Sequence, residues 1–146
     1  MKNTLLIAAL LGTLGFGTLL VQAQEAPNVV SASQAFAAIQ PDMQGTVTQP
    51  ILHAPAGDVL AVYVGHAPKQ VYTKQDELFY VISGHGTASV GYPSYQVGPG
   101  SVISVPRSTA FEITANGSAP LKAILIASPS DNPADKKILE PGTTQQ

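Results

Sequence analysis

Short segments of alternating or continuously apolar residues fill the middle of the chain and predict β-strands. "GTVTQPILHA" and "DVLAVYVGHA" come first and are joined by Pro55-Ala56-Gly57-Asp58, which is typical of a hairpin. "ELFYVISG", "GTASVG", "YQVGPGSVISVP", "AFEITANG" and "LKAILIAS" follow, separated by turn residues. Asn116-Gly117 favours a two-residue hairpin turn, because both residues tolerate a positive φ. About seven or eight short strands at this spacing predict an all-β sandwich or small barrel over residues 45–128.

The first 23 residues have a different pattern, which is typical of a secretory signal peptide. Lys2 supplies a positive charge, an apolar run follows, and Val21 and Ala23 are small residues at the positions that a signal peptidase reads. A membrane anchor is the alternative, but no cluster of charges follows the apolar run. We therefore predict cleavage after Ala23 and export to the bacterial periplasm or the extracellular space.

The segments on either side of the strands are less apolar. Residues 24–44 are expected to form an extended lead-in and a short helix over residues 31–40, in which Ser31 and Gln34 have the spacing of a capping box. Phe36 and Ile39 would form the buried face of this helix. Residues 129–146 are polar and contain prolines, which predicts a mostly flexible C-terminal tail with Ile138 and Leu139 as a candidate docking point.

Composition narrows the range of partners. Without residues 1–23 the chain has 146 − 23 = 123 residues, and its 7 − 1 = 6 cationic side chains face 9 acidic ones. Such a weakly acidic chain is a poor match for nucleic acid, and we expect no stable membrane association after signal cleavage. The sequence contains no cysteine, which excludes disulfides and thiolate metal sites.

The spacing of a few glycines, a glutamate and a proline then becomes informative. Gly65, Glu77 and Gly84 follow one another at intervals that resemble the first motif of the cupin superfamily. Gly100 and Pro106 have the spacing of the second motif. The resemblance covers about residues 59–128 and implies a cupin-like double-stranded β-helix, a jelly-roll barrel whose interior forms a pocket.

Cupins that hold a metal use two histidines and the glutamate of the first motif and one histidine of the second. In this chain the histidine positions hold Val71, Thr73 and Phe111, or Gln70, Tyr72 and Phe111 if the gap before the glutamate is one residue longer. Glu77 alone matches a ligand position. We therefore expect no metal site and no cofactor, with a divalent ion on a non-standard ligand set as the minor alternative.

The other histidines offer little to a metal. His53, His66 and His85 are not two to four residues apart, so they would have to converge from separate strands. His85 lies between two glycines in a tight turn and is expected to be exposed.

Alternation places Glu77, Phe79 and Val81 on one face of a strand, and Phe111 with Ile113 on one face of another. If both faces line the barrel interior, as the resemblance implies, Glu77 is a catalytic candidate. Burial would raise its pKa, as suits a general acid or base or a ligand anchor. Alternatively, Glu77 lies near the mouth and pairs with Lys74 or Arg107.

The predicted ligand pocket combines these residues with the polar ones before Glu77. Its members are Gln70, Tyr72, Thr73, Glu77, Phe79, Phe111 and Ile113. The favoured hypothesis is an exported cupin that binds a small polar molecule, a sugar or an organic acid, without the usual metal ligands. The alternative is an enzyme of isomerase, lyase or dioxygenase type that uses Glu77 as acid/base or a non-standard metal site. A homodimer built by sheet pairing is a third hypothesis.

Overall fold

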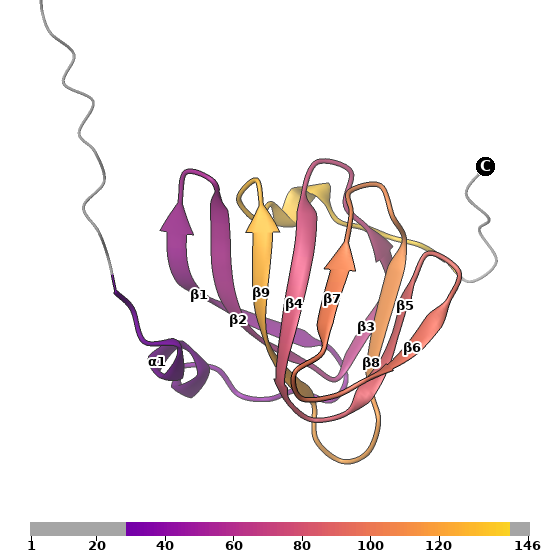
Figure 1. Cartoon of the computed structure of the whole chain (residues 1–146), viewed down its shortest axis with the longest axis horizontal. Helices are drawn as coiled ribbons and strands as arrows, with labels where there is room; N and C mark the ends of the chain where they lie inside the picture. The colour runs from indigo at the N-terminus through magenta and orange to yellow at the C-terminus, as the bar shows by residue number, and fades with distance from the viewer. Residues whose placement is uncertain (1–28, 141–146) are drawn as a thin grey trace, which may run out of the picture.

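The computed structural model describes residues 29–140 (Figure 1). The predicted signal peptide, residues 1–23, lies outside the described residues. Within residues 29–140, no helix is long and apolar enough to cross a membrane.

Two five-stranded antiparallel sheets make up the body of the protein (Figure 1). The first sheet contains, in spatial order, β1 (Thr46–Ala54), β2 (Gly57–Val64), β9 (Leu121–Ser128), β4 (Asp76–Ser83) and β7 (Val102–Val105). The second contains β10 (Lys137–Ile138), β3 (His66–Val71), β8 (Phe111–Ala115), β5 (Gly86–Val90) and β6 (Ser94–Val97). This arrangement confirms the predicted all-β jelly-roll fold with a short N-terminal helix.

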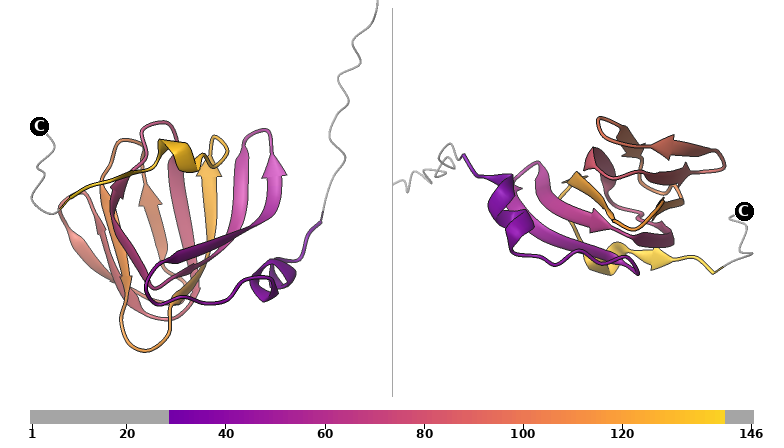
Figure 2. Two further views of the ribbon diagram at one scale, coloured as in Figure 1. Left: turned by 180° about the vertical axis from the view of Figure 1, so that it is seen from behind. Right: turned by 90° about the horizontal axis from the view of Figure 1, so that it is seen from below.

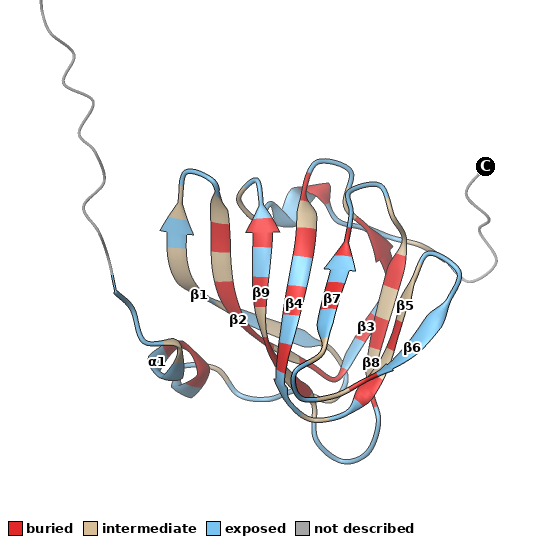
Figure 3. Ribbon diagram, viewed as in Figure 1, coloured by how far each residue is buried: buried red, intermediate tan, exposed pale blue. Residues whose placement is uncertain are grey.

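The core lies between the two sheets and follows the predicted alternation. Glu77, Phe79 and Val81 on β4 are buried, whereas Leu78 and Tyr80 between them are exposed. Figure 3 shows the same alternation of buried and exposed positions along β4, β7 and β9. The inward-facing side chains of the strands therefore form the apolar core between the two sheets.

The two predicted hairpin turns have different outcomes. The turn before Gly57 joins β1 to β2, which pair antiparallel as predicted. The prediction for Asn116-Gly117 is wrong, since β8 and β9 lie in different sheets and residues 116–120 cross between them. Gly117 does adopt a positive φ of 104°. The local preference was thus correct, but φ alone does not decide which strands pair.

The helix α1 (Ala32–Ala37) packs on the outer face of the first sheet, beside β1 and β2. Phe36 is buried there, with its ring centroid 5.5 Å from that of Tyr63, and Ile39 packs on the same cluster. The predicted buried face is therefore correct. The capping box is not formed, because the Ser31 hydroxyl lies 2.7 Å from that of Ser33 and makes no cap hydrogen bond.

The prediction of a flexible tail is wrong for residues 129–140. This C-terminal segment contains the 3₁₀ turn η1 (Pro133–Asp135) and β10, which pairs with β3. In Figure 2 the segment, drawn in yellow, runs across the strands at one end of the molecule. Its polar side chains bond to strand ends instead of to water, and a composition-based prediction does not see such pairing. Residues 141–146 lie outside the described part.

Candidate functional site

A cavity of about 320 Å³ lies inside the barrel, between the two sheets and the C-terminal segment. Of the predicted pocket residues, Gln70, Tyr72, Glu77, Phe79, Phe111 and Ile113 line it. Thr73 does not. Its hydroxyl donates to Asp135 Oδ1 at 2.6 Å, so Thr73 anchors the C-terminal segment and does not line the cavity.

Aromatic rings form one wall of the cavity. The rings of Tyr72 and Phe111 stack at 6.3 Å between centroids, and Phe79 lies 6.1 Å from Phe111 in a tilted arrangement. Phe111 is 1% exposed. Glu77 lines the same cavity, so these apolar rings form part of the surroundings of its carboxyl group.

Glu77 is the most perturbed acid of the cavity. It is 3% exposed, its Oε1 accepts a hydrogen bond from Gln75 Nε2 at 3.2 Å, and its Oε2 is buried without a partner. Burial first, and the charge of Asp131 to a smaller extent, raise the pKa of Glu77 to about 7 against the opposing effects of the Gln75 hydrogen bond and Lys136. The carboxyl group is thus poised between its neutral and charged forms at neutral pH.

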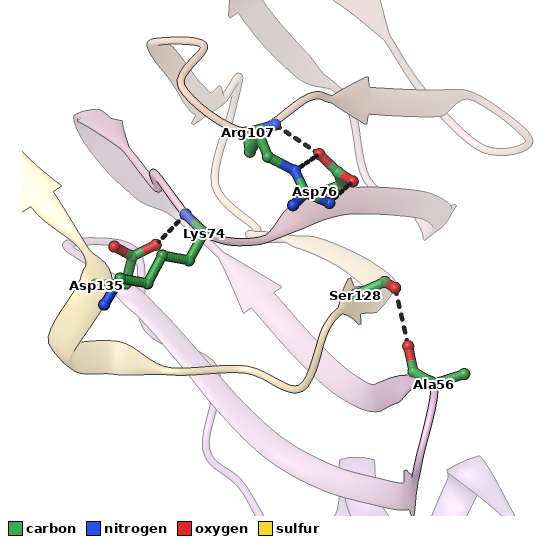
Figure 4. Close-up of polar contacts among 6 residues, drawn as sticks. All are labelled: Ala56, Lys74, Asp76, Arg107, Ser128 and Asp135. Carbon is green, nitrogen blue, oxygen red and sulfur yellow. Dashed lines mark hydrogen bonds and ion pairs between the residues drawn. The ribbon is translucent and has the colours of Figure 1, made fainter.

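Neither alternative partner, Arg107 or Lys74, forms an ion pair with Glu77 among the described residues. Arg107 donates to Asp76 through its side chain, with 2.7 Å between Nη2 and Oδ2 (Figure 4). The backbone N–H of Lys74 donates to Asp135 Oδ2 at 2.7 Å (Figure 4). Among the described residues, Gln75 is the hydrogen-bond partner that Glu77 has.

Two further polar side chains accompany Glu77 on the cavity wall. Gln70 is 8% exposed, and Tyr72 is partly buried. Burial, followed by the charge of Glu77, raises the pKa of Tyr72, so its phenol stays protonated at neutral pH and keeps its O–H donor. Val71 is buried but does not line the cavity. The structure therefore selects the register in which Gln70 and Tyr72, and not Val71 and Thr73, point inward.

The donor set at the expected ligand positions does not fit a transition metal. Phe111 has no lone pair, the Gln70 amide is a weak ligand, and the Tyr72 phenol resists ionisation. Within residues 29–140, no three His, Cys, Asp or Glu side chains are grouped so that they could hold an ion. Glu77 is then the one carboxylate at the expected ligand positions, and one carboxylate among such neighbours is a poor match for an ion of this kind.

The three histidines lie apart from one another in the fold. His66 lines the cavity, and its Nδ1 lies 3.0 Å from Thr114 Oγ1. His53 contacts Asp58 through Nδ1 and Oδ1, and His85 is exposed in its turn. They do not converge into the alternative three-histidine site.

Apart from Ile138, expected as a docking point, the sequence did not point to the residues that the C-terminal segment adds to the cavity. This segment contributes Asp131, Pro133, Lys136 and Ile138. No local pattern marks them, because their position depends on Asp135, which accepts from the backbone N–H of Thr73 at 2.8 Å across 62 residues of sequence. Thr46 and Thr48 on β1 also line the cavity, and their spacing of two on a predicted strand is a signal that could have found them.

Comparisons with known proteins agree on the fold. The family described as Cupin domain matches residues 58–127. The nucleoside dehydratase Pac13 from Streptomyces superposes with a TM-score of 0.61 at 16% identity, covering 78% of this chain and 92% of that one. The sequence matches none of the curated proteins with which it was compared.

Two other solved structures extend the likeness. A conserved protein with a double-stranded β-helix domain from Klebsiella pneumoniae has a TM-score of 0.63 at 13% identity and covers 79% of this chain and 99% of its own. The cupin domain of Cnp3 from Schizosaccharomyces pombe has a TM-score of 0.57 at 13% identity, over 64% and 71% of the two chains. At these identities the structures show a shared fold and nothing of ligand or activity. Taken with the family match across the barrel strands, the shared fold makes this chain a member of the cupin superfamily.

Proposed function

We propose that this cupin binds a small, neutral, hydroxyl-rich molecule such as a sugar in the barrel cavity, without a transition metal. The observation that carries the proposal is Glu77, buried on the cavity wall with Oε2 unpartnered. A buried polar atom without a partner is destabilising, and a ligand hydroxyl would supply the missing hydrogen bond.

The other walls support the same class of ligand. A cavity of about 320 Å³ suits a molecule of one ring. The stacked rings of Tyr72 and Phe111 offer an apolar surface to the face of such a ring. An organic acid would bring its own charge towards Glu77 and Asp131, so the geometry favours a sugar over an organic acid.

The test is a thermal-shift screen of the purified protein with monosaccharides, nucleosides and small carboxylic acids. Uridine belongs in it, since a variant of Streptomyces PAC13 with the same fold was solved with uridine. We expect a neutral polyol to raise Tm. At one hundred times its Kd, a ligand adds about 2.7 kcal/mol to the free energy of unfolding.

Glu77→Gln should raise the Kd of the polyol at least tenfold. Glu112→Gln, on the face of β8 opposite to Phe111, should leave this Kd unchanged. Stabilisation by carboxylic acids alone, insensitive to Glu77→Gln, would overturn the proposal.

A second candidate function is acid/base catalysis on the bound molecule. The pKa of about 7 favours it, because neutral and charged Glu77 coexist at physiological pH, as a proton-transfer group requires. Of the reaction types expected from the sequence, an isomerase or lyase fits a metal-free carboxyl group better than a dioxygenase does. Once a substrate is known, Glu77→Gln should abolish turnover even at substrate concentrations that saturate the weakened site. Unchanged turnover in that variant would exclude this role.

A further inference from the structure

A buried amide connects Glu77 to the C-terminal segment. Gln75 is 1% exposed, and its Nε2 donates to Glu77 Oε1 at 3.2 Å and to Asp131 Oδ1 at 3.0 Å. Its Oε1 accepts from the backbone N–H of Asn132 at 2.9 Å. The two acids belong to parts of the chain more than fifty residues apart, because Gln75 and Asp131 are separated by 56 positions.

The orientation of this amide is determined by its partners. A primary amide has two N–H hydrogens and one carbonyl oxygen, and here both hydrogens face carboxylates while the oxygen faces an N–H donor. A flipped amide would place its oxygen against Glu77 and Asp131 and its NH₂ group against the N–H of Asn132. The contacts with Asp131 and with the Asn132 N–H would then be repulsive whatever the protonation state of Glu77, so the docked C-terminal segment fixes which side of Gln75 faces Glu77.

We propose that Gln75 is a positioning residue for Glu77: anchored by Asp131 and Asn132, it holds Oε1 and leaves Oε2 as the oxygen that carries the proton and meets the ligand. The part of this inference that concerns a ligand rests on the proposed function, whereas the part that concerns the position of the proton does not. The cavity site is then complete only when the C-terminal segment is docked.

The proton of neutral Glu77 belongs on Oε2 for a geometric reason. Oε1 already accepts the Gln75 N–H, and a proton placed there would compete with that donor for the same oxygen. Oε2 has no such donor. A ligand therefore meets an O–H donor when Glu77 is neutral and a bare acceptor when it is charged.

The segment that anchors Gln75 is itself held at two other points. Asp135 accepts from Thr73 and Lys74, and the backbone N–H of Asp131 donates to Asp58 Oδ2 at 2.9 Å. The other titratable groups of the cavity are His66 on β3, Tyr72 just after β3 and Lys136 on the C-terminal segment. Asp131 and Lys136 act on the pKa of Glu77 in opposite directions, and both come from the docked segment.

The experiment measures the pKa of Glu77 directly, in the ligand-free full chain, from the ¹³C shift of its carboxyl carbon. Gln75→Leu removes both donors at nearly constant volume, so the pKa of Glu77 should rise, by roughly one pH unit. Asp131→Asn removes a charge but keeps an acceptor oxygen for Gln75, so the pKa of Glu77 should fall, by less than it rises in Gln75→Leu. Glu112→Gln removes the same charge on the opposite face of β8 and should leave Glu77 unchanged.

A second readout separates positioning from general loosening. Hydrogen exchange at the backbone amide of Asn132 should accelerate in Gln75→Leu, because this N–H loses its acceptor. It should stay unchanged in Asp131→Asn. A fall in the Glu77 pKa in Gln75→Leu, or shifts of the same sign in both variants, would overturn the inference. If Gln75→Leu does not fold, Asp131→Asn alone still decides, since a rise or no shift there would contradict it. If the pKa of Glu77 shifts as expected in both variants but the protein binds no polyol, the proposed function is refuted. The inference that Gln75 positions Glu77 is then still supported.

Discussion

Asp76 and Glu77 are neighbours on β4 and carry the same functional group, yet the two carboxyl groups are held in opposite states. Asp76 faces outward and accepts from the Arg107 side chain, which lowers its pKa to about 2 (Figure 4). Glu77 faces the cavity, where burial raises its pKa to about 7. Adjacent side chains of a strand point to opposite faces, so Asp76 meets solvent and a cation whereas Glu77 meets apolar rings. The direction of the side chain, and not the residue type, therefore decides the pKa of each carboxyl group.

Asp135 shows that burial by itself does not account for the difference. It is also buried, at 7% exposed, but accepts from two backbone N–H groups and the Thr73 hydroxyl. These hydrogen bonds, that of the Thr73 hydroxyl first, lower the pKa of Asp135. Glu77 has one donor and an unpartnered oxygen. The fold saturates the carboxylate that holds the chain together and leaves unsaturated the one that lines the cavity.

The largest effect should come from removing part of the aromatic wall of the cavity that Glu77 faces. Phe111→Ala should lower the free energy of unfolding by about 3–5 kcal/mol, measured by urea denaturation. It should also lower the pKa of Glu77, since water would enter beside the carboxyl group.

Phe36→Ala is the matched control. Phe36 is also buried, but it lies under α1 on the outer face of the first sheet. This variant should lose stability without changing the titration of Glu77. If the pKa of Glu77 stayed near 7 in Phe111→Ala, burial by the ring would not be its cause.

A smaller effect should appear in the pH dependence of the free energy of unfolding, to which Glu77 and Asp76 contribute in different pH ranges. Because the folded pKa of Glu77, about 7, lies above its unfolded value of 4.5, the folded state binds the proton more tightly. Wild-type stability should therefore fall as pH rises from 4.5 through 7, by up to about 3 kcal/mol.

Glu77→Gln should lack this decline, whereas Glu112→Gln should keep it. Urea denaturation at pH 5, 6, 7 and 8 compares the three proteins. A parallel pH dependence in wild type and Glu77→Gln would mean that Glu77 is not the group that titrates.

The smallest effect should come from Asp76→Asn. The folded pKa of about 2 lies below the unfolded value of 3.8, so the contribution of Asp76 is present above 3.8 and is lost as pH falls through 2. Because the pair with Arg107 is exposed, the variant should be only slightly less stable at neutral pH, and less so in high salt. Denaturation at pH 7 and pH 3 tests this, with Arg107→Gln as the partner variant. Any change in the Glu77 titration would show that the two faces of β4 are coupled.

Local periodicity determined much of this protein. Alternation placed Glu77 with Phe79 and Phe111 with Ile113 on inward faces, since successive side chains of a strand point to opposite sides. The spacing of glycines, Glu77 and Pro106 indicated the cupin superfamily. This spacing can be recognised in the sequence because a few neighbouring residues determine each turn and strand end.

The tertiary structure alone decided which polar residues surround the cavity. The register of β3 shifts between Ala67 and Gln70, and this irregularity turns Gln70 and Tyr72 inward where strict alternation is ambiguous. The C-terminal segment reaches the cavity because Asp135 and Asp131 find partners on distant strands. Backbone geometry repeats over two residues and can be read locally, whereas a hydrogen bond across 56 residues exists only after the sheets have packed.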